Sequence, residues 1–263
     1  MLLSPGVSAA VDLKLSVHSA ILMDMTTGRV LLSHNADDPL QPASIAKVLS
    51  LYLADEAIRE GRVRPTDPVK ISRKAQRTGG SKMFLQAGSE IPLQDLLKGM
   101  AVVSANDASV AVAEYLGGNV ENFVKQMNGK ARELGMNNSC FKNPNGLPAR
   151  GQFTTARDML VLACDYLRQF PECLELHSQQ YFTYRDITQR NRNSLLRRYP
   201  DADGLKTGWV VQAGYHIVAT AKRGKTRLIA VVMGAKTPSI RTRETERLLD
   251  EGFMMVRRDL RQG

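Results

Sequence analysis

The segment PASIAKVLSLYL spans residues 42–53. Its apolar side chains recur at helical spacing, with Pro42 near the start and Gly61 as a stop signal. The segment therefore predicts a helix that opens at Ser44 and buries its apolar side in a core. Ser44 and Lys47 are three residues apart, so both side chains project from one face of this helix.

Strand patterns lie on both sides of this helix. Residues 19–34 alternate apolar and polar side chains around Thr26-Thr27-Gly28, which predicts a hairpin. Residues 215–221 and 227–234 predict two more strands around a turn, and a final helix carries Leu248, Leu249 and Phe253. The strands thus come from both ends of the chain.

The middle of the chain is predicted to be all-helical. Residues 93–116 have a helical pattern with a polar interruption at 104–107, and residues 120–134 form a second helix that ends at Gly135. Thr155 and Asp158 form a capping-box pattern before the apolar run 159–167. This order predicts an α+β fold, an antiparallel sheet packed between helices, without βαβ repeats.

Composition is that of a globular protein with a buried core, at 43% hydrophobic and 24% charged residues. The 36 Lys and Arg residues exceed the 26 acidic residues and give a net charge of +10, so anionic partners have to be considered. The most basic stretch, residues 185–198, lacks the interleaved aromatic residues of single-strand binders. A solvated surface is the better interpretation, and we predict no nucleic-acid partner.

Residues 1–16 are predicted to be an amino-terminal tail or the remnant of a signal peptide, because Val7-Ser8-Ala9-Ala10 resembles the small-residue end of a secretory signal. Residues 17–263 are predicted to form one domain. No apolar run is long enough for a transmembrane segment. The three cysteines have neither C-x-x-C spacing nor nearby histidines, so no metal or other cofactor is expected.

The pair Ser44 and Lys47 has a chemical interpretation. A serine hydroxyl is a weak nucleophile until a base takes its proton, and lysine can be that base only if its surroundings lower its pKa from about 10.4. The backbone N–H groups at a helix start can hold the oxyanion that forms on attack. The alternative is a helix-capping serine beside a surface lysine.

Two further motifs support the chemical interpretation. Ser104-Ala105-Asn106 lies at the interruption between two helices, where a hydroxyl and an amide can face a cleft; a polar turn is the alternative. Lys206-Thr207-Gly208 follows the predicted turn Asp203-Gly204 and begins a strand, where Lys206 and Thr207 can grip a carboxylate. Gly208 would let a substrate backbone approach closely; an ordinary strand start is the alternative.

Together, S-x-x-K, S-x-N and K-T-G in this order resemble the active-site serine penicillin-recognising enzymes. The chain from about Val17 to about Val256 resembles the low-molecular-mass penicillin-binding proteins, which are serine-type D-alanyl-D-alanine carboxypeptidases. The resemblance implies a β-lactamase-like and penicillin-binding-protein-like fold. Its further motifs are residues 42–44, 80–85, 143–147, 154–158, 203–208 and 213–215.

The resemblance also implies roles for individual residues. Ser44 would be the acylated nucleophile and Lys47 its base, with Ser104 and Asn106 as the proton-relay and positioning pair. The substrate-binding group would consist of Lys206 and Thr207 as a carboxylate clamp, Gly208, and Trp209, whose backbone N–H would complete the oxyanion hole with that of Ser44.

Substrate, inhibitors and location follow from the same resemblance. The expected substrates are peptidoglycan stem peptides ending in D-Ala-D-Ala, and β-lactams are expected as covalent inhibitors. The expected location is the periplasm or the outer face of the cytoplasmic membrane, after export. Many members of the family also carry a β-rich second domain and an amphipathic carboxy-terminal anchor, neither of which is expected within this sequence.

Two residues depart from the family pattern, and several alternatives stay open. Val210 and Gln152 stand where the family commonly has threonine and histidine. A D,D-endopeptidase would use the same residues on an internal bond, and a silent peptidoglycan-binding module would keep only the cleft. A β-lactamase would need a deacylating carboxylate, which residues 143–147 do not offer. A Ser-His-Asp hydrolase is disfavoured because the sequence has no G-x-S-x-G motif.

Overall fold

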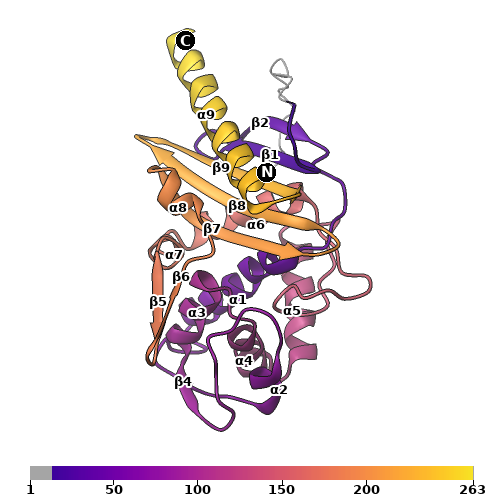
Figure 1. Ribbon diagram of the computed structural model, residues 1–263, viewed down its shortest axis with the longest axis vertical. Coiled ribbons are helices and arrows are strands. Elements are labelled where there is room, and N and C mark those ends of the chain that lie inside the picture. Colours follow the sequence, from indigo (N-terminus) through magenta and orange to yellow (C-terminus); the bar gives the residue numbers. More distant parts are fainter. Residues whose placement is uncertain (1–13, 263) are drawn as a thin grey trace.

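The computed structural model, which describes residues 14–262, has a five-stranded antiparallel sheet above a mostly helical region (Figure 1). The strand order is β2-β1-β9-β8-β7, and every neighbouring pair is antiparallel. The α+β fold and the strands drawn from both ends of the chain are therefore confirmed. The five strands are β1 (Ser19–Asp24), β2 (Arg29–His34), β7 (Ala202–Val210), β8 (Gly214–Arg223) and β9 (Thr226–Ala235).

Helices cover both faces of this sheet. Helix α9 packs on β1, β8 and β9 from one side, and α6 packs on the same three strands from the other. The helices are η1 (Ala43–Ala46, a 3-10 turn), α1 (Lys47–Arg59), α2 (Arg73–Arg77), α3 (Leu93–Val102), α4 (Asn106–Gly117), α5 (Val120–Glu133), α6 (Ala156–Gln169), α7 (Cys173–His177), α8 (Leu195–Arg198) and α9 (Pro238–Gln262).

The central strands are buried on both faces, which explains their nearly continuous apolar sequence. Alternate residues point to two cores. Ile217 and Leu228 pack with Leu248 of α9 in one core, whereas Val218 and Ile229 belong to the larger core that includes α1, α3, α4 and α6. The sheet is thus the middle layer between two sets of helices.

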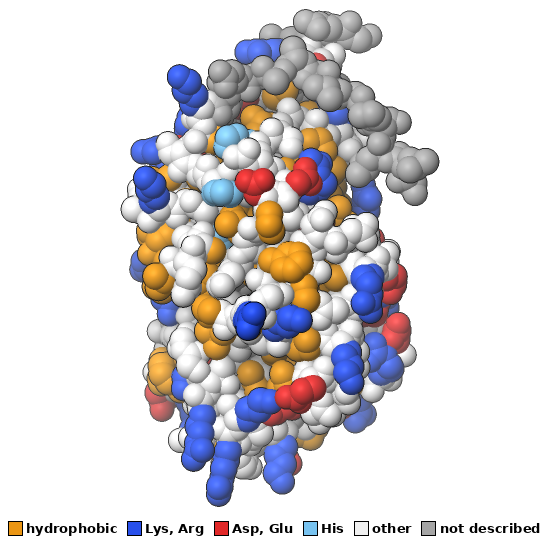
Figure 2. All heavy atoms as spheres, turned by 90° about the vertical axis from the view of Figure 1, so that its right-hand side faces the viewer, with side chains coloured by type: hydrophobic (Ala, Val, Ile, Leu, Met, Phe, Trp, Pro, Cys, Tyr) orange, Lys and Arg blue, Asp and Glu red, His pale blue; other side chains and the backbone are white. Residues whose placement is uncertain are grey.

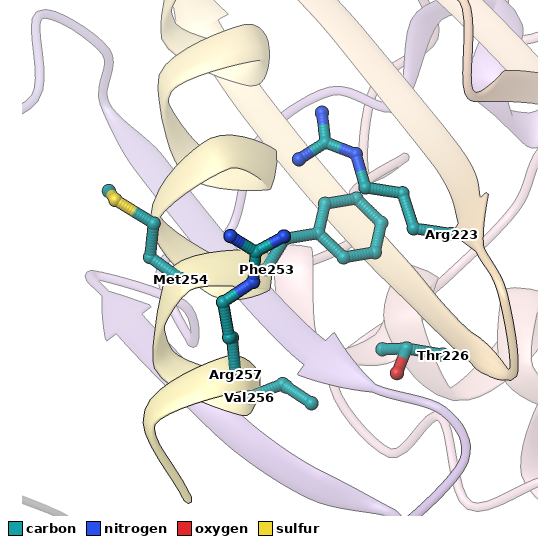
Figure 3. A pocket seen from close by; sticks show the side chains of 6 residues that line it. All are labelled: Arg223, Thr226, Phe253, Met254, Val256 and Arg257. Atoms are coloured by element: carbon teal, nitrogen blue, oxygen red, sulfur yellow. The ribbon is translucent and has the colours of Figure 1, made fainter. Parts of the chain in front are cut away.

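Side-chain contacts hold the carboxyl-terminal half of helix α9 against the sheet. The Arg223 guanidinium lies over the Phe253 ring at 4.4 Å and over the Tyr199 ring at 5.3 Å, and it donates a hydrogen bond to Asp201. Figure 3 shows the surface hollow at this junction, lined by Arg223, Phe253 and Arg257 among others. It lies at the β8–β9 turn, the opposite end of these strands from the β7–β8 turn.

The middle region differs from the prediction because it is not helical throughout. It also contains the hairpin β3 (Pro68–Lys70) with β4 (Glu90–Pro92), and a second hairpin, β5 (Tyr181–Tyr184) with β6 (Ile187–Arg190), precedes β7. Asp203 and Gly204, predicted to form a turn, lie inside β7, where the register shifts between Ala202 and Gly204. Strands of three or four residues are too short to show a periodic pattern.

Among residues 14–262, no helix is both long and apolar enough to cross a membrane. The signal-like stretch Val7-Ser8-Ala9-Ala10 lies outside the described residues.

Candidate active site

Ser44 lies in η1, the turn that leads directly into α1, as predicted for a residue at the start of this helix. Strand β7, one of the two edge strands of the five-stranded sheet, packs against η1. A β-carbon at Gly208 would lie 2.9 Å from the backbone nitrogen of Ser44 and 3.0 Å from Cβ of Ala43. Gly208 is therefore required for the contact between β7 and the serine turn, a reason not foreseen from the sequence.

Lys47 is fully buried and lies at the centre of the site. Its Nζ is 2.9 Å from Oγ of Ser44, 2.7 Å from Oδ1 of Asn106 and 2.8 Å from the carbonyl oxygen of Asn145. Burial, assisted by the charge of Lys206, lowers the pKa of Lys47 well below its ordinary value. A neutral amine has two protons for Asn106 and Asn145 and a lone pair for the hydroxyl of Ser44.

The S-x-N motif lies between α3 and α4, as predicted. Ser104 is buried and has a left-handed backbone conformation with φ of 65°, which is uncommon outside glycine. Asn106 follows at the start of α4, where its Nδ2 donates to the carbonyl of Gly79 at 2.7 Å and its backbone N–H donates to the carbonyl of Ser81 at 2.8 Å. The amide that faces Lys47 is thus held in one orientation.

Asp107 is the buried acidic residue whose charge acts on Lys47, where it opposes the lowering of the pKa. Its carboxylate accepts the backbone N–H groups of Met83 and Leu85, each at 3.1 Å. Those bonds fix the loop of residues 79–85 against α4. Because its oxygens are engaged in them, Asp107 is a poor candidate for a base that activates water.

The loop of residues 143–147 supplies the carbonyl that faces Lys47. Gly146 has φ of +78°, and a β-carbon there would lie 1.7 Å from the carbonyl oxygen of Ala43, so only glycine fits. Gln152 donates to the carbonyl of Leu147 at 2.8 Å and accepts from the N–H of Lys142 at 2.9 Å. Gln152, which stands where the family commonly has histidine, therefore helps to hold this loop in place.

Lys206 lies on β7 and is almost fully buried, with its Nζ 3.1 Å from the carbonyl oxygen of Thr207. Burial, then the charges of Arg192 and Arg241, lower its pKa to about 7. Burial also lowers the pKa of Arg241, which comes from α9, to about 10. Nε of Arg241 is buried and has no hydrogen-bond partner among residues 14–262.

The charges of Arg192 and Arg241 thus act on Lys206, which lies on the strand that packs against the serine turn, and this arrangement favours binding of an anion. The sequence analysis identified Lys206 but neither arginine as part of the site. Arg192 was assigned to a solvated basic surface, and Arg241 comes from a helix distant in sequence. Neither residue stands in a motif, so only the fold could reveal them.

The predicted residues are therefore close together. Ser44, Lys47 and Asn106 form one hydrogen-bonded cluster, and Lys206 to Trp209 lie on the strand that packs beside it. Ser104 lies at the turn that carries Asn106. Val210, which stands where the family commonly has threonine, packs with Ala43 and Ala213.

No histidine among residues 14–262 is hydrogen-bonded to Ser44. His177 and His216 are buried and contact backbone carbonyls of Leu205 and Gln41, and His18 pairs with Asp38 on the surface. A Ser-His-Asp arrangement is thus absent from this part of the chain, and lysine is the group placed to act on the serine.

A serine at a helix start, a buried lysine bonded to it and a K-T-G strand beside them define the class of penicillin-recognising serine enzymes. A family model described as D-alanyl-D-alanine carboxypeptidase, peptidase S11, matches residues 6–237. The chain belongs to this family.

Individual relatives agree with this assignment. D-alanyl-D-alanine carboxypeptidase DacC of Escherichia coli is 43% identical over 240 residues, which are 89% of this chain and 60% of that protein. The structure of penicillin binding protein 5 from Haemophilus influenzae matches with a TM-score of 0.90 and 38% identity, over 95% of this chain and 73% of that one. The chain spans about three fifths of the length of the curated relatives that it matches.

A third relative has been solved with a β-lactam. Penicillin-binding protein D2 from Listeria monocytogenes, in its ampicillin-bound form, matches with a TM-score of 0.84 and 30% identity. The match covers 92% of this chain and 99% of that one. The predicted fold and family are confirmed by these likenesses.

Proposed function

We propose that this protein is a serine-type D-Ala-D-Ala carboxypeptidase, which removes the terminal D-alanine from peptidoglycan stem peptides through an acyl-enzyme on Ser44. The observation that carries the proposal is the buried amine of Lys47, placed 2.9 Å from Oγ of Ser44 and held by Asn106 and Asn145. The names of the relatives support the substrate class.

The reaction begins with proton transfer from Oγ of Ser44 to the neutral amine of Lys47. Oγ then forms a bond to the carbonyl carbon of the penultimate D-alanine. The negative charge that develops on the carbonyl oxygen is held by the backbone N–H groups of Ser44 and Trp209. The C–N bond breaks as the leaving amine receives the proton, relayed by Lys47 and the hydroxyl of Ser104. Water then hydrolyses the ester and restores Ser44.

The free carboxylate of the substrate is assigned to the cationic region of β7. Lys206 and Thr207 would contact it directly, and the charges of Arg192 and Arg241 would favour it further. A chain end satisfies these groups better than an internal peptide bond does. This electrostatic match favours the carboxypeptidase over the D,D-endopeptidase.

β-Lactams are proposed as covalent inhibitors through the same serine. The carboxylate of Asp107 is bonded to backbone N–H groups, and residues 143–147 carry no carboxylate, so neither place supplies the carboxylate base with which a β-lactamase hydrolyses a penicilloyl ester quickly. A penicilloyl ester on Ser44 would therefore persist. This inference also disfavours β-lactamase activity.

We also propose where the protein is located and which residues form its domain. Because peptidoglycan lies outside the cytoplasmic membrane, the substrate implies an exported protein, in the periplasm or at the outer face of that membrane. We also infer that residues 17–263 form a single transpeptidase-like domain, because both cores of the molecule use the sheet that its two ends build.

The test is labelling with a fluorescent penicillin, read beside release of D-alanine from a D-Ala-D-Ala peptide. The wild-type protein and the control Ser33→Ala, a change on the exposed side of β2, should label and release D-alanine. Ser44→Ala should do neither while keeping its circular dichroism spectrum. Unlabelled wild-type protein, or labelled Ser44→Ala, would reject the proposed nucleophile.

A further inference from the structure

His216 lies on β8, is fully buried, and takes no part in the proton transfers of the proposed reaction. Its cross-strand partner is Gly208, where a β-carbon would meet the backbone nitrogen of Ser44. Directly paired residues of two antiparallel strands point to the same face of a sheet. The imidazole of His216 therefore points to the side of the sheet on which Ser44 lies.

Both ring nitrogens of His216 contact backbone groups. Nδ1 is 3.0 Å from the backbone nitrogen of Gly234, and Nε2 is 3.0 Å from the carbonyl oxygen of Gln41. Because the N–H of Gly234 is a donor, Nδ1 must be the acceptor, and the ring hydrogen is then on Nε2, which donates to Gln41. The ring is neutral in this arrangement, in agreement with its burial, which lowers the pKa of His216 to about 4.

The contact with Gly234 fixes the ring in the sheet. The pairing of β8 with β9 shifts its register between Tyr215 and Ile217, and Gly234 stands outside the paired residues. Such a shift is typical of a β-bulge, and bulges next to active sites commonly re-aim a side chain. The N–H of Gly234 donates to Nδ1 instead of to a strand, and this bond directs Nε2 at Gln41.

The Gln41 carbonyl is separated from the backbone nitrogen of Ser44 by only two residues, Pro42 and Ala43. The ring of Pro42 restricts its φ, which is −68°. Ala43 has φ of 47°, a left-handed conformation that is unfavourable for alanine and persists only where the surroundings hold it in place. The bond from His216 holds the start of this short, strained segment, so its loss should release Ser44 at the other end.

We propose that His216 is a positioning residue for the acylation of Ser44. By holding the Gln41 carbonyl, it fixes the hydroxyl of Ser44 beside Lys47 and the N–H of Ser44 in the oxyanion hole. Displacements of reacting groups by about 1 Å slow reactions by about 10²-fold, so a single contact of this kind has a measurable effect. The inference rests on the proposed function, because it requires Ser44 to be the nucleophile.

His18 is the histidine with which His216 can be compared. A β-carbon at Gly234 would lie 2.4 Å from Cβ of His18, so both histidines are neighbours of this glycine. The side chain of His18, however, is 47% exposed and pairs with Asp38. Figure 2 shows histidine and acidic side chains next to one another on this outer face. Of the two histidines, His216 is the one that is hydrogen-bonded to the segment before Ser44.

The experiment compares two variants that each retain one contact of the ring. The amide nitrogen of the side chain in His216→Gln can take the place of Nε2 and donate to Gln41. The amide oxygen in His216→Asn can take the place of Nδ1 and accept from Gly234, but this shorter side chain does not reach Gln41. Stopped-flow mixing with a fluorescent penicillin measures the acylation rate constant, the Kd of the complex that precedes acylation, and the fraction of protein that is labelled.

His216→Asn should slow acylation by about 10- to 100-fold. Its Kd should change little, because the carboxylate clamp of Lys206 and Thr207 lies on β7. His216→Gln should acylate within about twofold of the wild-type rate, since it retains the bond to Gln41. Both variants lose one hydrogen bond of a buried ring, so the urea midpoint of unfolding should fall in both.

Two controls separate positioning from stability. Tyr199→Phe loses the hydrogen bond to Asp250 and should lower the urea midpoint without slowing acylation. His18→Gln changes an exposed histidine and should alter neither quantity. A purely structural role of His216 predicts a smaller labelled fraction with an unchanged rate constant. If His216→Asn does not fold, the same change is made together with Gly129→Ala, which adds a favourable helix residue where a β-carbon meets nothing within 4 Å.

A wild-type acylation rate constant in His216→Asn would overturn the proposal. Equal slowing in His216→Asn and His216→Gln would also overturn it, because the ring would then act by filling space and not through Gln41. Either result leaves the proposed function intact, since the wild-type protein still labels at Ser44. A wild-type protein that does not label would lose the reaction itself.

Discussion

Lys47 combines complete burial with three hydrogen-bonding partners, none of which carries a charge. Desolvation disfavours the ammonium, and the nearby charge of Lys206 disfavours it further. A lysine in this environment becomes neutral at a pH where a solvent-exposed lysine is still protonated. The environment that disfavours its charge is thus the one that the proposed role as a base requires.

The protonation state of Lys47 predicts the pH dependence of acylation. The rate of penicillin acylation should rise with pH as Lys47 loses its proton, and a flat rate between about pH 6 and about pH 10 would contradict the assignment. Lys47→Arg should slow acylation by about 10²- to 10⁴-fold, because the guanidinium does not release its proton. Lys98→Arg, at a partly exposed helix position, is the matched control.

Lys206 predicts the preference for a chain end. Amidation of a D-Ala-D-Ala peptide should reduce kcat/KM of the wild type by about tenfold or more, because a charge-assisted contact is lost. Lys206→Ala should reduce this penalty, although Arg192 and Arg241 should preserve part of it. Equal rates on both peptides in the wild type would reject the carboxypeptidase in favour of the endopeptidase.

The sequence was sufficient to predict side chains that the fold brings close together, but not all the groups that surround them. Ser44, Lys47, Ser104, Asn106 and Lys206 stand in motifs whose spacing is informative. The carbonyl of Asn145 is a main-chain group and leaves no side-chain pattern. Arg192 and Arg241 act through space, so their contribution depends on the packing of α9 and the segment before α8 against β7.

The contact between β7 and η1 positions Ser44. Gly208→Ala would place a β-carbon 2.9 Å from the nitrogen of Ser44 and should displace the serine turn by a few tenths of an ångström. We expect acylation to slow by about 10²-fold, since small displacements of reacting groups are costly. Overpacking should also lower the free energy of unfolding by about 1 to 3 kcal/mol.

The control for Gly208→Ala is Gly129→Ala, in α5, where a β-carbon would meet nothing within 4 Å. This variant should acylate normally and should be more stable by about 0.5 to 1 kcal/mol, because alanine favours the helix. Stopped-flow acylation and urea unfolding measure both quantities. Normal acylation in Gly208→Ala would show that the close contact does not position Ser44.

Elements longer than about nine residues were predictable because amphipathic periodicity accumulates over several turns. The interruption at residues 104–107, for example, separates α3 from α4 as expected. The short hairpins β3–β4 and β5–β6 were missed, because their pairing is decided by tertiary contacts. The β-strand at Asp203 and Gly204 was taken for a turn because local residue preferences there favour turns.

Buried histidines couple folding of the whole molecule to pH. Burial lowers the pKa of His177 and of His216 from 6.5 to about 4. The unfolded chain therefore binds protons that the folded protein excludes, and stability falls as the pH drops from about 6.5 to about 4. By about pH 4, each histidine should have lowered the free energy of unfolding by roughly 3 kcal/mol. Burial raises the pKa of Asp55 to about 6, which opposes this loss.

Urea unfolding at about pH 7 and about pH 4.5 tests this coupling. The wild type should lose stability at the lower pH, and His177→Gln, which keeps a neutral donor near the carbonyl of Leu205, should lose roughly 2 to 3 kcal/mol less. His34→Gln, at a partly exposed position on β2, is the control. An equal loss in all three proteins would assign the acid sensitivity to other groups.

The strand order has a consequence for how the molecule assembles. The central strand, β9, comes from near the end of the chain, and its partner β1 comes from near the start, with Ser19 opposite Met233. During synthesis the first hairpin has no sheet to join until β9 has been made, because closure of so long a loop must precede the pairing. Ser44 and Lys206 likewise meet only when β7 reaches η1. The growing chain therefore remains without its complete sheet, and without Lys206 beside the serine turn, until synthesis has passed β9 at residue 235.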